Sequence, residues 1–239
     1  MKDEVEYLIE DPTDPTSHLH LSSKAALLNY LRFADEMRRL LDAGDKVLDW
    51  GCGLGQMSWL LERRGLAVTS YDIARVPEEK LIIEMERVIL GSDPVLLPFP
   101  SATFDAVLSC GVLEHVVDEM GSLQEIRRVL KLGGFFFIYQ LPQLYAYTEF
   151  INCWRGFWHH TRRYTPHTIQ RELESIGFRV VRQRRANFLP RNLTGLPPQV
   201  RGVYNRIGGL VNLVDRGLSR VPLLNLLCHS IETLAIKER

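Results

Sequence analysis

The chain has 239 residues, of which 46% are hydrophobic, and its 29 Lys and Arg residues balance its 29 Asp and Glu residues. This length is enough for one substantial core, and no segment is biased enough in composition to predict disorder. The sequence has no run of about eighteen uncharged apolar residues, and its acidic start over 1–10 lacks the apolar stretch of a secretory signal, so neither a membrane-spanning helix nor secretion is expected.

The four cysteines are Cys52, Cys110, Cys153 and Cys228. No two of them have the C-x-x-C spacing of a zinc or redox pair, and nothing indicates a disulfide framework. A reducing compartment fits this pattern best. We therefore expect a cytoplasmic protein that holds no metal ion.

Short apolar runs alternate with amphipathic stretches, which is typical of a parallel sheet covered by helices. A helical lead-in is expected over 1–43. Helices are expected over about 25–41, 56–64, 121–130 and 166–175, the third of them closed by the turn 131–134. Strands are expected over 46–50, 66–71, 87–90, 104–109, 134–139, 178–183 and 231–237. The segment after the fifth strand is expected to be a loop rich in aromatic residues.

Residues 187–229, between the last two strands, contain two apolar helical patterns. Apolar residues recur at intervals of three and four from Val203 to Leu218, and 221–227 is nearly all apolar. The segment is interpreted as a helical insertion within a single domain that spans 1–239. Its apolar face and its arginines would suit a peripheral membrane contact or a homodimer through 190–227, or a lid over a pocket.

The balanced net charge conceals two unequal halves. Residues 1–120 contain 11 Lys and Arg against 22 Asp and Glu, whereas residues 121–239 contain 18 against 7, and no acid lies between Glu174 and Asp215. This arginine-rich stretch could face an anionic partner, or it could fold against the acidic half of the same molecule. Both interpretations stay open.

The chemistry is concentrated in the turn from Asp49 to Gly55. A strand that turns through Gly-x-Gly-x-Gly into a helix brings bare backbone close to a ligand. The spacing is not the G-x-G-x-x-G of dinucleotide-binding folds, and the carboxylate of Asp49 would repel a pyrophosphate but would suit an α-ammonium group. Asp72 ends the next strand, where a carboxylate can accept both hydroxyls of a ribose. A sulfonium ligand with amino-acid and nucleoside ends satisfies all three features.

These residues resemble the class I S-adenosylmethionine (SAM) dependent methyltransferases. The segment 47–55 is similar to their motif I, 71–73 to their ribose-binding motif, and Asp93 to the acid that approaches the adenine amino group. The likeness continues through 109–116 and 128–134. It implies an α/β fold with a Rossmann-like, doubly wound, mostly parallel sheet of seven strands whose last strand is antiparallel. The cofactor would be SAM, bound by Asp49, Gly51, Cys52, Gly53, Gly55, Gln56, Asp72, Ile73, Asp93, Pro94, Ser109, Cys110 and Gly111.

His115 lies just beyond the fourth strand and is the first candidate for a general base, because histidine titrates near neutral pH. Its Leu-Glu-His-Val context also resembles quinone-biosynthesis O-methyltransferases and other members with different acceptors, which favours a supporting role instead. Side chains expected at the acceptor site are Trp158, His159, His160 and Tyr164. The alternative is a packed aromatic loop with surface histidines.

The function implied is transfer of a methyl group from SAM to a small-molecule, glycan or lipid-linked acceptor, at oxygen. A nucleic-acid or protein methyltransferase is the first alternative, supported by the arginine-rich stretch alone. Against it, the fourth strand is followed by Ser-Cys-Gly-Val and not by the Asn/Asp-Pro-Pro-Tyr motif suited to an extruded base. A non-catalytic SAM-binding module is the second alternative.

Overall fold

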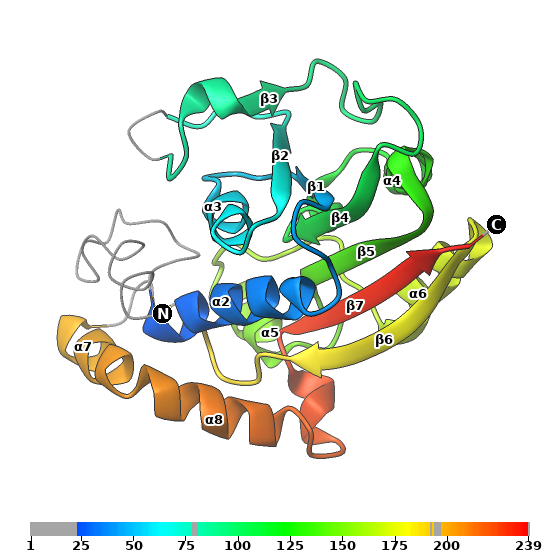
Figure 1. The fold of residues 1–239 in the computed structure, drawn as a ribbon. Coiled ribbons are helices and arrows are strands. Elements are labelled where there is room, and N and C mark those ends of the chain that lie inside the picture. The colour runs from blue at the N-terminus through cyan, green and yellow to red at the C-terminus, as the bar shows by residue number, and fades with distance from the viewer. Residues whose placement is uncertain (1–22, 78–80, 192, 194–196, 239) are drawn as a thin grey trace.

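The computed structural model describes residues 23–77, 81–191, 193 and 197–238. Their seven strands form one sheet in the order β3-β2-β1-β4-β5-β7-β6 (Figure 1). The strands are β1 (Lys46–Trp50), β2 (Ala67–Asp72), β3 (Val88–Leu90), β4 (Phe104–Cys110), β5 (Leu130–Pro142), β6 (Phe178–Ala186) and β7 (Ser230–Lys237). β7 runs antiparallel to both of its neighbours, and the other pairs are parallel. The expected fold class is confirmed.

Helices cover both faces of the sheet (Figure 1). The α-helices are α2 (Lys24–Arg38), α3 (Gln56–Glu62), α4 (Glu119–Val129), α5 (Tyr147–Trp154), α6 (Pro166–Ser175), α7 (Pro198–Arg206) and α8 (Gly208–Leu218). The short 3-10 helices are η2 (Met85–Arg87), η3 (Leu113–His115) and η4 (Leu224–Leu227). Local chemistry sets several starts: the Ser23 hydroxyl caps α2, and Thr165 with Thr168 forms a capping box on α6.

The core has two halves because successive strand residues point to opposite faces. One half is built from Leu48, Val107, Phe136 and Ile138 of the sheet with Leu123, Ile126, Ile169 and Leu173 of α4 and α6. The other is built from Val47, Ala106, Leu108 and Phe137 with Phe33, Met37, Leu60 and Leu61 of α2 and α3. Helix α8 packs outside α2 and not against the sheet (Figure 1).

Two expected segments differ from the structure. The helix expected over 121–130 is α4, which ends at Val129, and the residues expected to form its closing turn belong to β5. The pairing with β4 steps from Phe104–Leu130 to Ala106–Phe135, so the extra residues form a bulge within a continued strand. In addition, the aromatic segment after β5 contains helix α5. Of the lead-in over 1–43, residues 1–22 lie outside the described part of the chain.

The order of the strands determines where a ligand can bind. From β1 the chain passes outward to β2 and β3 and then returns to β4 on the other side of β1. At the carboxyl ends of these two central strands, Trp50 is paired with Ser109. Open α/β sheets bind ligands in the crevice at such a switch point.

Candidate active site

The glycine turn after β1 is held by backbone hydrogen bonds to β2. The N–H groups of Gly51 and Cys52 both donate to the carbonyl of Tyr71, at 2.8 and 3.0 Å. Gly51, Gly53 and Gly55 all have positive φ, between 53° and 81°. A Cβ on Gly51 would lie 2.6 Å from a methyl carbon of Val112, and one on Gly55 would lie 2.4 Å from Ile83. Glycine is therefore required at both positions by conformation and by space.

Asp49 lies beneath this turn as a buried carboxylate, 2% exposed. Its Oδ2 accepts a hydrogen bond of 2.7 Å from the Ser58 hydroxyl, which accepts one of 2.7 Å from Ser70. Burial raises the pKa of Asp49 to about 6, although the hydrogen bonds from Ser58 lower it. A cationic ligand group beside this carboxylate would stabilise its charged form. The surroundings of Asp49 fit an α-ammonium group.

Asp72 and Asp93, the two acids expected at the nucleoside end, both bind backbone. Asp72 Oδ2 accepts from the Gly53 N–H at 2.9 Å, and its Oδ1 accepts from the N–H of Ala74 at 2.9 Å. Asp93 Oδ1 accepts from the N–H groups of Val95 and Leu96, and these bonds lower the pKa of Asp93. Asp72 thus ties the end of β2 to the glycine turn, which sets the position of its carboxylate beside that turn.

Two buried polar atoms at the switch point lack partners among the described residues. They are Gln56 Oε1, at the start of α3, and Ser109 Oγ, near the end of β4. Buried polar atoms are normally hydrogen-bonded, so these two are available to a ligand. Together with the bare backbone of Gly51 and the buried carboxylate of Asp49, they fit a molecule with an amino-acid end.

The remaining expected cofactor residues differ in exposure. Ile73 is 53% exposed beside Asp72, and Pro94 is exposed next to Asp93. The Gly111 N–H donates to the Tyr139 carbonyl at 3.0 Å. Burial raises the pKa of Cys52 and of Cys110, which keeps both thiols protonated and unreactive.

A cluster of buried acids and histidines lies just beyond β4. The Nδ1 atom of His160 is 3.0 Å from Glu149 Oε1, and the His160 N–H donates to Glu149 Oε2 at 2.8 Å. Glu149, on α5, is 1% exposed. Burial raises the pKa of Glu149, but the hydrogen bonds and charge of His160 outweigh burial and hold that pKa below its ordinary value. His160 is therefore oriented by an ionised carboxylate.

Glu114 is the second buried acid of the cluster. Its Oε1 lies 3.8 Å from His115 Nε2 and 3.9 Å from His160 Nε2. Its Oε2 is buried and has no hydrogen-bond partner among the described residues. Burial raises the pKa of Glu114 to about 7, although nearby cations lower it. Sequence reasoning missed both Glu114 and Glu149, because nothing in their spacing relates them to His160.

The side chains expected at the acceptor site differ from one another in burial and in the groups that they contact. His115 is 52% exposed at its side chain, with its ring centroid 6.1 Å from that of Trp158 and 5.6 Å from that of His160. His159 Nδ1 lies 3.2 Å from the Phe157 carbonyl of its own loop. Tyr164 is 3% exposed in the core, and its hydroxyl donates to the Leu113 carbonyl. Tyr164 thus supports η3 from the core side, and its contact with an acceptor stays a prediction.

The acceptor cluster adjoins the cofactor turn through η3. Val112, against which Gly51 packs, immediately precedes Leu113, the first residue of η3. Arg162 donates to the carbonyls of Leu113 and Val116, at 3.3 and 2.7 Å, so the loop that carries His160 also holds this helix. The histidine cluster is therefore held next to the cofactor turn by η3.

Residues 48–138, from β1 into β5, match the family model described as a methyltransferase domain. This part of the chain is a class I SAM-dependent methyltransferase domain. Its strands supply the glycine turn, Asp72 and η3, and the cofactor of its class is SAM.

Curated relatives of the methyltransferase domain act on several kinds of small molecule. A ubiquinone biosynthesis O-methyltransferase from Xylella fastidiosa is 33% identical over 135 residues, which cover 54% of this chain and 52% of that protein. A sterol 24-C-methyltransferase from Gibberella zeae is 34% identical over 105 residues, covering 41% of this chain and 28% of that protein. This chain spans about half the length, or less, of these relatives, so the match supports the domain and not a particular acceptor.

Solved structures share the fold of most of this chain at low identity. A SAM-dependent methyltransferase from Archaeoglobus fulgidus has a TM-score of 0.57 at 23% identity, covering 87% of this chain and 94% of that one. A 1,6-didemethyltoxoflavin N1-methyltransferase from Burkholderia thailandensis has a TM-score of 0.53 at 21% identity, covering 88% and 79%. A [4+2]-cyclase also matches, with a TM-score of 0.57 at 19% identity, covering 87% and 81%. The fold alone therefore does not determine the reaction.

The cluster beside the methyltransferase domain's cofactor turn also has the donor atoms of a metal site. Glu114, His115 and His160 each place one ligand atom within 4.8 Å of the other two. One carboxylate oxygen and two imidazole nitrogens form a donor set that zinc and related ions accept. The expectation of no metal rested on cysteine spacing and did not consider these residues.

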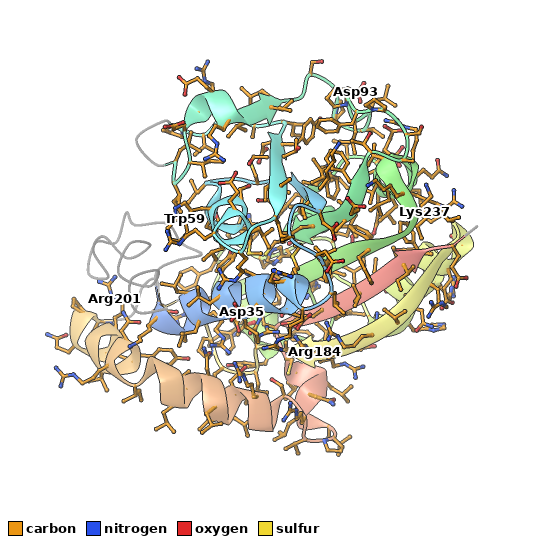
Figure 2. All side chains as sticks on the ribbon, in the orientation of Figure 1. Asp35, Trp59, Asp93, Arg184, Arg201 and Lys237 are labelled. Atoms are coloured by element: carbon orange, nitrogen blue, oxygen red, sulfur yellow. The ribbon has the colours of Figure 1, made fainter. Side chains whose placement is uncertain are left out.

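The arginine-rich stretch folds largely against the molecule's own acids. Arg182 and Arg184, on β6, both pair with Glu36 of α2, the latter at 2.8 Å. Arg184 also pairs with Glu232 of β7 at 2.6 Å, and Figure 2 shows it beside α2 and β6. Arg179 pairs with Glu238 and Arg191 with Asp215. These pairs remove the main support for a nucleic-acid substrate.

Proposed function

We propose that this chain transfers the methyl group of SAM to a hydroxyl of a small-molecule, glycan or lipid-linked acceptor, with His160 as the general base. The observation that carries the proposal is the 3.0 Å contact between His160 Nδ1 and the buried carboxylate of Glu149. It leaves Nε2, the other ring nitrogen, on the side of Glu114 and His115. An imidazole held in this way is suited to accept a proton.

The cofactor supplies an electrophilic methyl group on a sulfonium. Asp49 would bind its α-ammonium group, and Asp72 would accept hydrogen bonds from its ribose hydroxyls. Nε2 of His160 would take the acceptor's hydroxyl proton as the acceptor oxygen bonds to the methyl carbon. The carbon–sulfur bond would break with its electron pair left on sulfur, and the positive charge lost from the sulfonium would be carried by the protonated His160 imidazole. Most of the acceleration would come from holding the acceptor in line with the methyl group.

His160 is preferred over His115 as the base for geometric reasons. The His160 side chain is 14% exposed and contacts a carboxylate at 3.0 Å, whereas the His115 side chain is 52% exposed and lies 3.8 Å from the nearest oxygen of Glu114. A fixed orientation matters because a base must lie within hydrogen-bond reach of the proton that it takes. His115 and Trp158 are proposed to contact the acceptor at the rim of the site.

The test is methyl transfer from SAM labelled in its methyl group. The protein is incubated with labelled SAM and an extract that is then separated into lipid, aqueous small-molecule, nucleic-acid and protein fractions. Label in the first or second fraction, lost in His160→Gln while calorimetry shows unchanged SAM binding, supports the proposal. Label in nucleic acid or protein contradicts it, and SAM binding without transfer to any fraction indicates a binding module.

A metal-assisted transfer is the second candidate, favoured by the grouping of Glu114, His115 and His160. In that case a cation would bind the acceptor oxygen and the His160 imidazole would be its ligand. The two candidates separate on dialysis against a chelator. With His160 as base, turnover is unchanged after metal removal, whereas turnover that is lost and then restored by added zinc or manganese would favour the metal.

A further inference from the structure

Helix α8 buries polar side chains and exposes apolar ones. Facing α2, it buries Gly208, Val211, Asn212 and Asp215. Toward solvent it presents Leu210, Leu213 and Val214, which are 57%, 67% and 44% exposed. A surface helix of a protein surrounded only by water has the opposite arrangement. The exposed stripe continues into Val203 and Ile207 at the preceding turns.

Polar bonds fix this orientation of α8. Asp215 Oδ1 accepts from the Leu189 N–H at 2.7 Å, and its Oδ2 accepts from Arg191 at 2.6 Å. Arg191 also donates to Asn212 and, at 3.0 Å, to the Ala25 carbonyl of α2. Turning the apolar face inward would leave these buried groups without partners, which is energetically unfavourable. The outward apolar face is therefore imposed by the fold.

Helix α5 has the same inverted arrangement. Its one buried residue is Glu149, while Phe150, Ile151 and Trp154 are 56%, 45% and 87% exposed. The start of α5 adjoins η4, because Thr148 Oγ1 lies 2.8 Å from His229 Nδ1. Four exposed leucines lie in η4 or directly before it, namely Leu223, Leu224, Leu226 and Leu227. The exposed apolar side chains of α5 and of η4 thus lie next to the acceptor cluster.

The charges that these two segments expose are of one sign. Residues 197–229 contain four arginines and a single acid, Asp215, and residues 145–160 contain a single acid, Glu149. Both acids are buried. Arg206, Arg216 and Arg220 are exposed, and Figure 2 shows Arg201 on α7, remote from the sheet. No carboxylate of these two segments is exposed to oppose an anionic partner.

We propose that α5, α7, α8 and η4 form a docking surface for an anionic lipid bilayer, and we call these elements the docking surface. Exposed leucines and aromatics with arginines among them match the apolar interior and negative headgroups of such a bilayer. A bilayer also accepts apolar side chains from separate elements without a matching shape. None of the described helices is long and apolar enough to cross a membrane, so the docking surface rests on the bilayer.

Docking would place the acceptor cluster at the lipid surface. The His229 ring lies 6.2 Å from the ring of His160, and Trp158 lies 4.5 Å from the same ring, between centroids. A lipid-linked acceptor would then enter from the membrane side. That consequence rests on the proposed function, whereas docking itself requires neither SAM nor methyl transfer, so the two can fail separately.

The test is flotation of the full chain with vesicles, without SAM or acceptor. Vesicles of phosphatidylcholine alone are compared with vesicles that contain phosphatidylglycerol. The wild type should float with the anionic vesicles, and the bound fraction should fall at high salt. Leu213→Gln should weaken partitioning by about tenfold or more, since the variant no longer buries a leucine side chain in the bilayer. Arg216→Glu with Arg220→Glu should also weaken it.

The matched control for Leu213→Gln is Leu132→Gln, because Leu132 is 63% exposed on the bulge of β5, outside the docking surface. The control for the two arginine substitutions is Arg171→Glu, on α6. Circular dichroism verifies folding, and blue-shifted tryptophan fluorescence on vesicles, reduced in Trp154→Phe, is a second readout. The proposal is overturned if the wild type stays in solution with anionic vesicles, if Leu213→Gln and Leu132→Gln float equally, or if Leu213→Gln only dissociates a dimer that does not bind vesicles.

Discussion

His160 Nδ1 lies 3.0 Å from Glu149 Oε1, and the acid is the only buried residue of helix α5. The pair explains why α5 turns a carboxylate inward: the acid orients the imidazole and is itself kept ionised by it. The apolar residues of α5 are thereby left facing outward. One contact thus connects the acid–base chemistry of the site with the character of the surface around it.

If Glu149 positions the base, Glu149→Gln should lower kcat by about tenfold or more, and His160→Gln by about a hundredfold or more, which is the usual range for a general base. The dissociation constant for SAM should change little, because neither side chain lies at the cofactor turn. Glu149→Asp should restore part of kcat. His159→Gln, in the same loop, is the control and should remain active. If SAM binding falls as much as kcat in these variants, Glu149 and His160 have a structural role instead.

Binding of SAM should weaken as the pH falls below about 6. Asp49 has a pKa of about 6 in the free protein, and the cationic α-ammonium group favours its ionised form, so protonation opposes binding. Titration calorimetry between pH 5 and 8 should show this loss for the wild type. Asp49→Asn should bind about tenfold or more weakly at pH 8 and lose the pH dependence. A pH-independent wild type would contradict the ammonium assignment.

Gly51→Ala should impair the cofactor turn. Its φ of 72° disfavours a side chain by about 1–2 kcal/mol, and the new Cβ would meet Val112 at 2.6 Å. Both the melting temperature and SAM affinity should fall. Gly202→Ala is the matched control, because it lies within α7 with open space around it, and alanine should stabilise a helix there by about 0.5–1 kcal/mol. An unchanged SAM affinity in Gly51→Ala would count against a cofactor at this turn.

Glu114 should make the folded protein less stable as the pH rises from about 4.5 to about 7. Its pKa is raised from 4.5 to about 7 by burial, so in this window the native state holds a proton that the unfolded state has released. The free energy of unfolding of Glu114→Gln should match the wild type near pH 4.5 and exceed it by up to about 3 kcal/mol at pH 8. Urea unfolding across this range measures the difference. Glu84 is an exposed acid, so the stability of Glu84→Gln should follow pH in parallel with that of the wild type. A parallel curve for Glu114→Gln would contradict the raised pKa of Glu114.

Local motifs made the cofactor half of the molecule predictable. Asp49 and the three glycines lie within seven residues, and their conformational demands are local, so the turn could be predicted from sequence. Asp72 followed from its place at the end of the next strand. The parallel order of strands around β1 then brought these residues together as expected.

The acceptor half was less predictable because its contacts join distant segments. Glu114, Glu149 and His160 come from η3, α5 and the loop before α6, and no spacing in the sequence relates them. Helix α5 was expected to be a loop, since its apolar residues face outward and its inward face carries a glutamate. Tyr164 was expected at the acceptor site for its polar tip, but its ring fills the core beneath η3.

The insertion leaves the sheet after Ala186 and returns at Ser230, and these two residues are paired neighbours in the sheet. The segment therefore begins and ends at one place, so its length can vary without altering the register of any strand. Evolution could exchange this segment while the cofactor turn stays unchanged on the far side of the sheet. Membrane docking through α7, α8 and η4 would then vary separately from binding of the methyl donor, and grafting 187–229 between relatives would be a practical route to changing where such an enzyme acts.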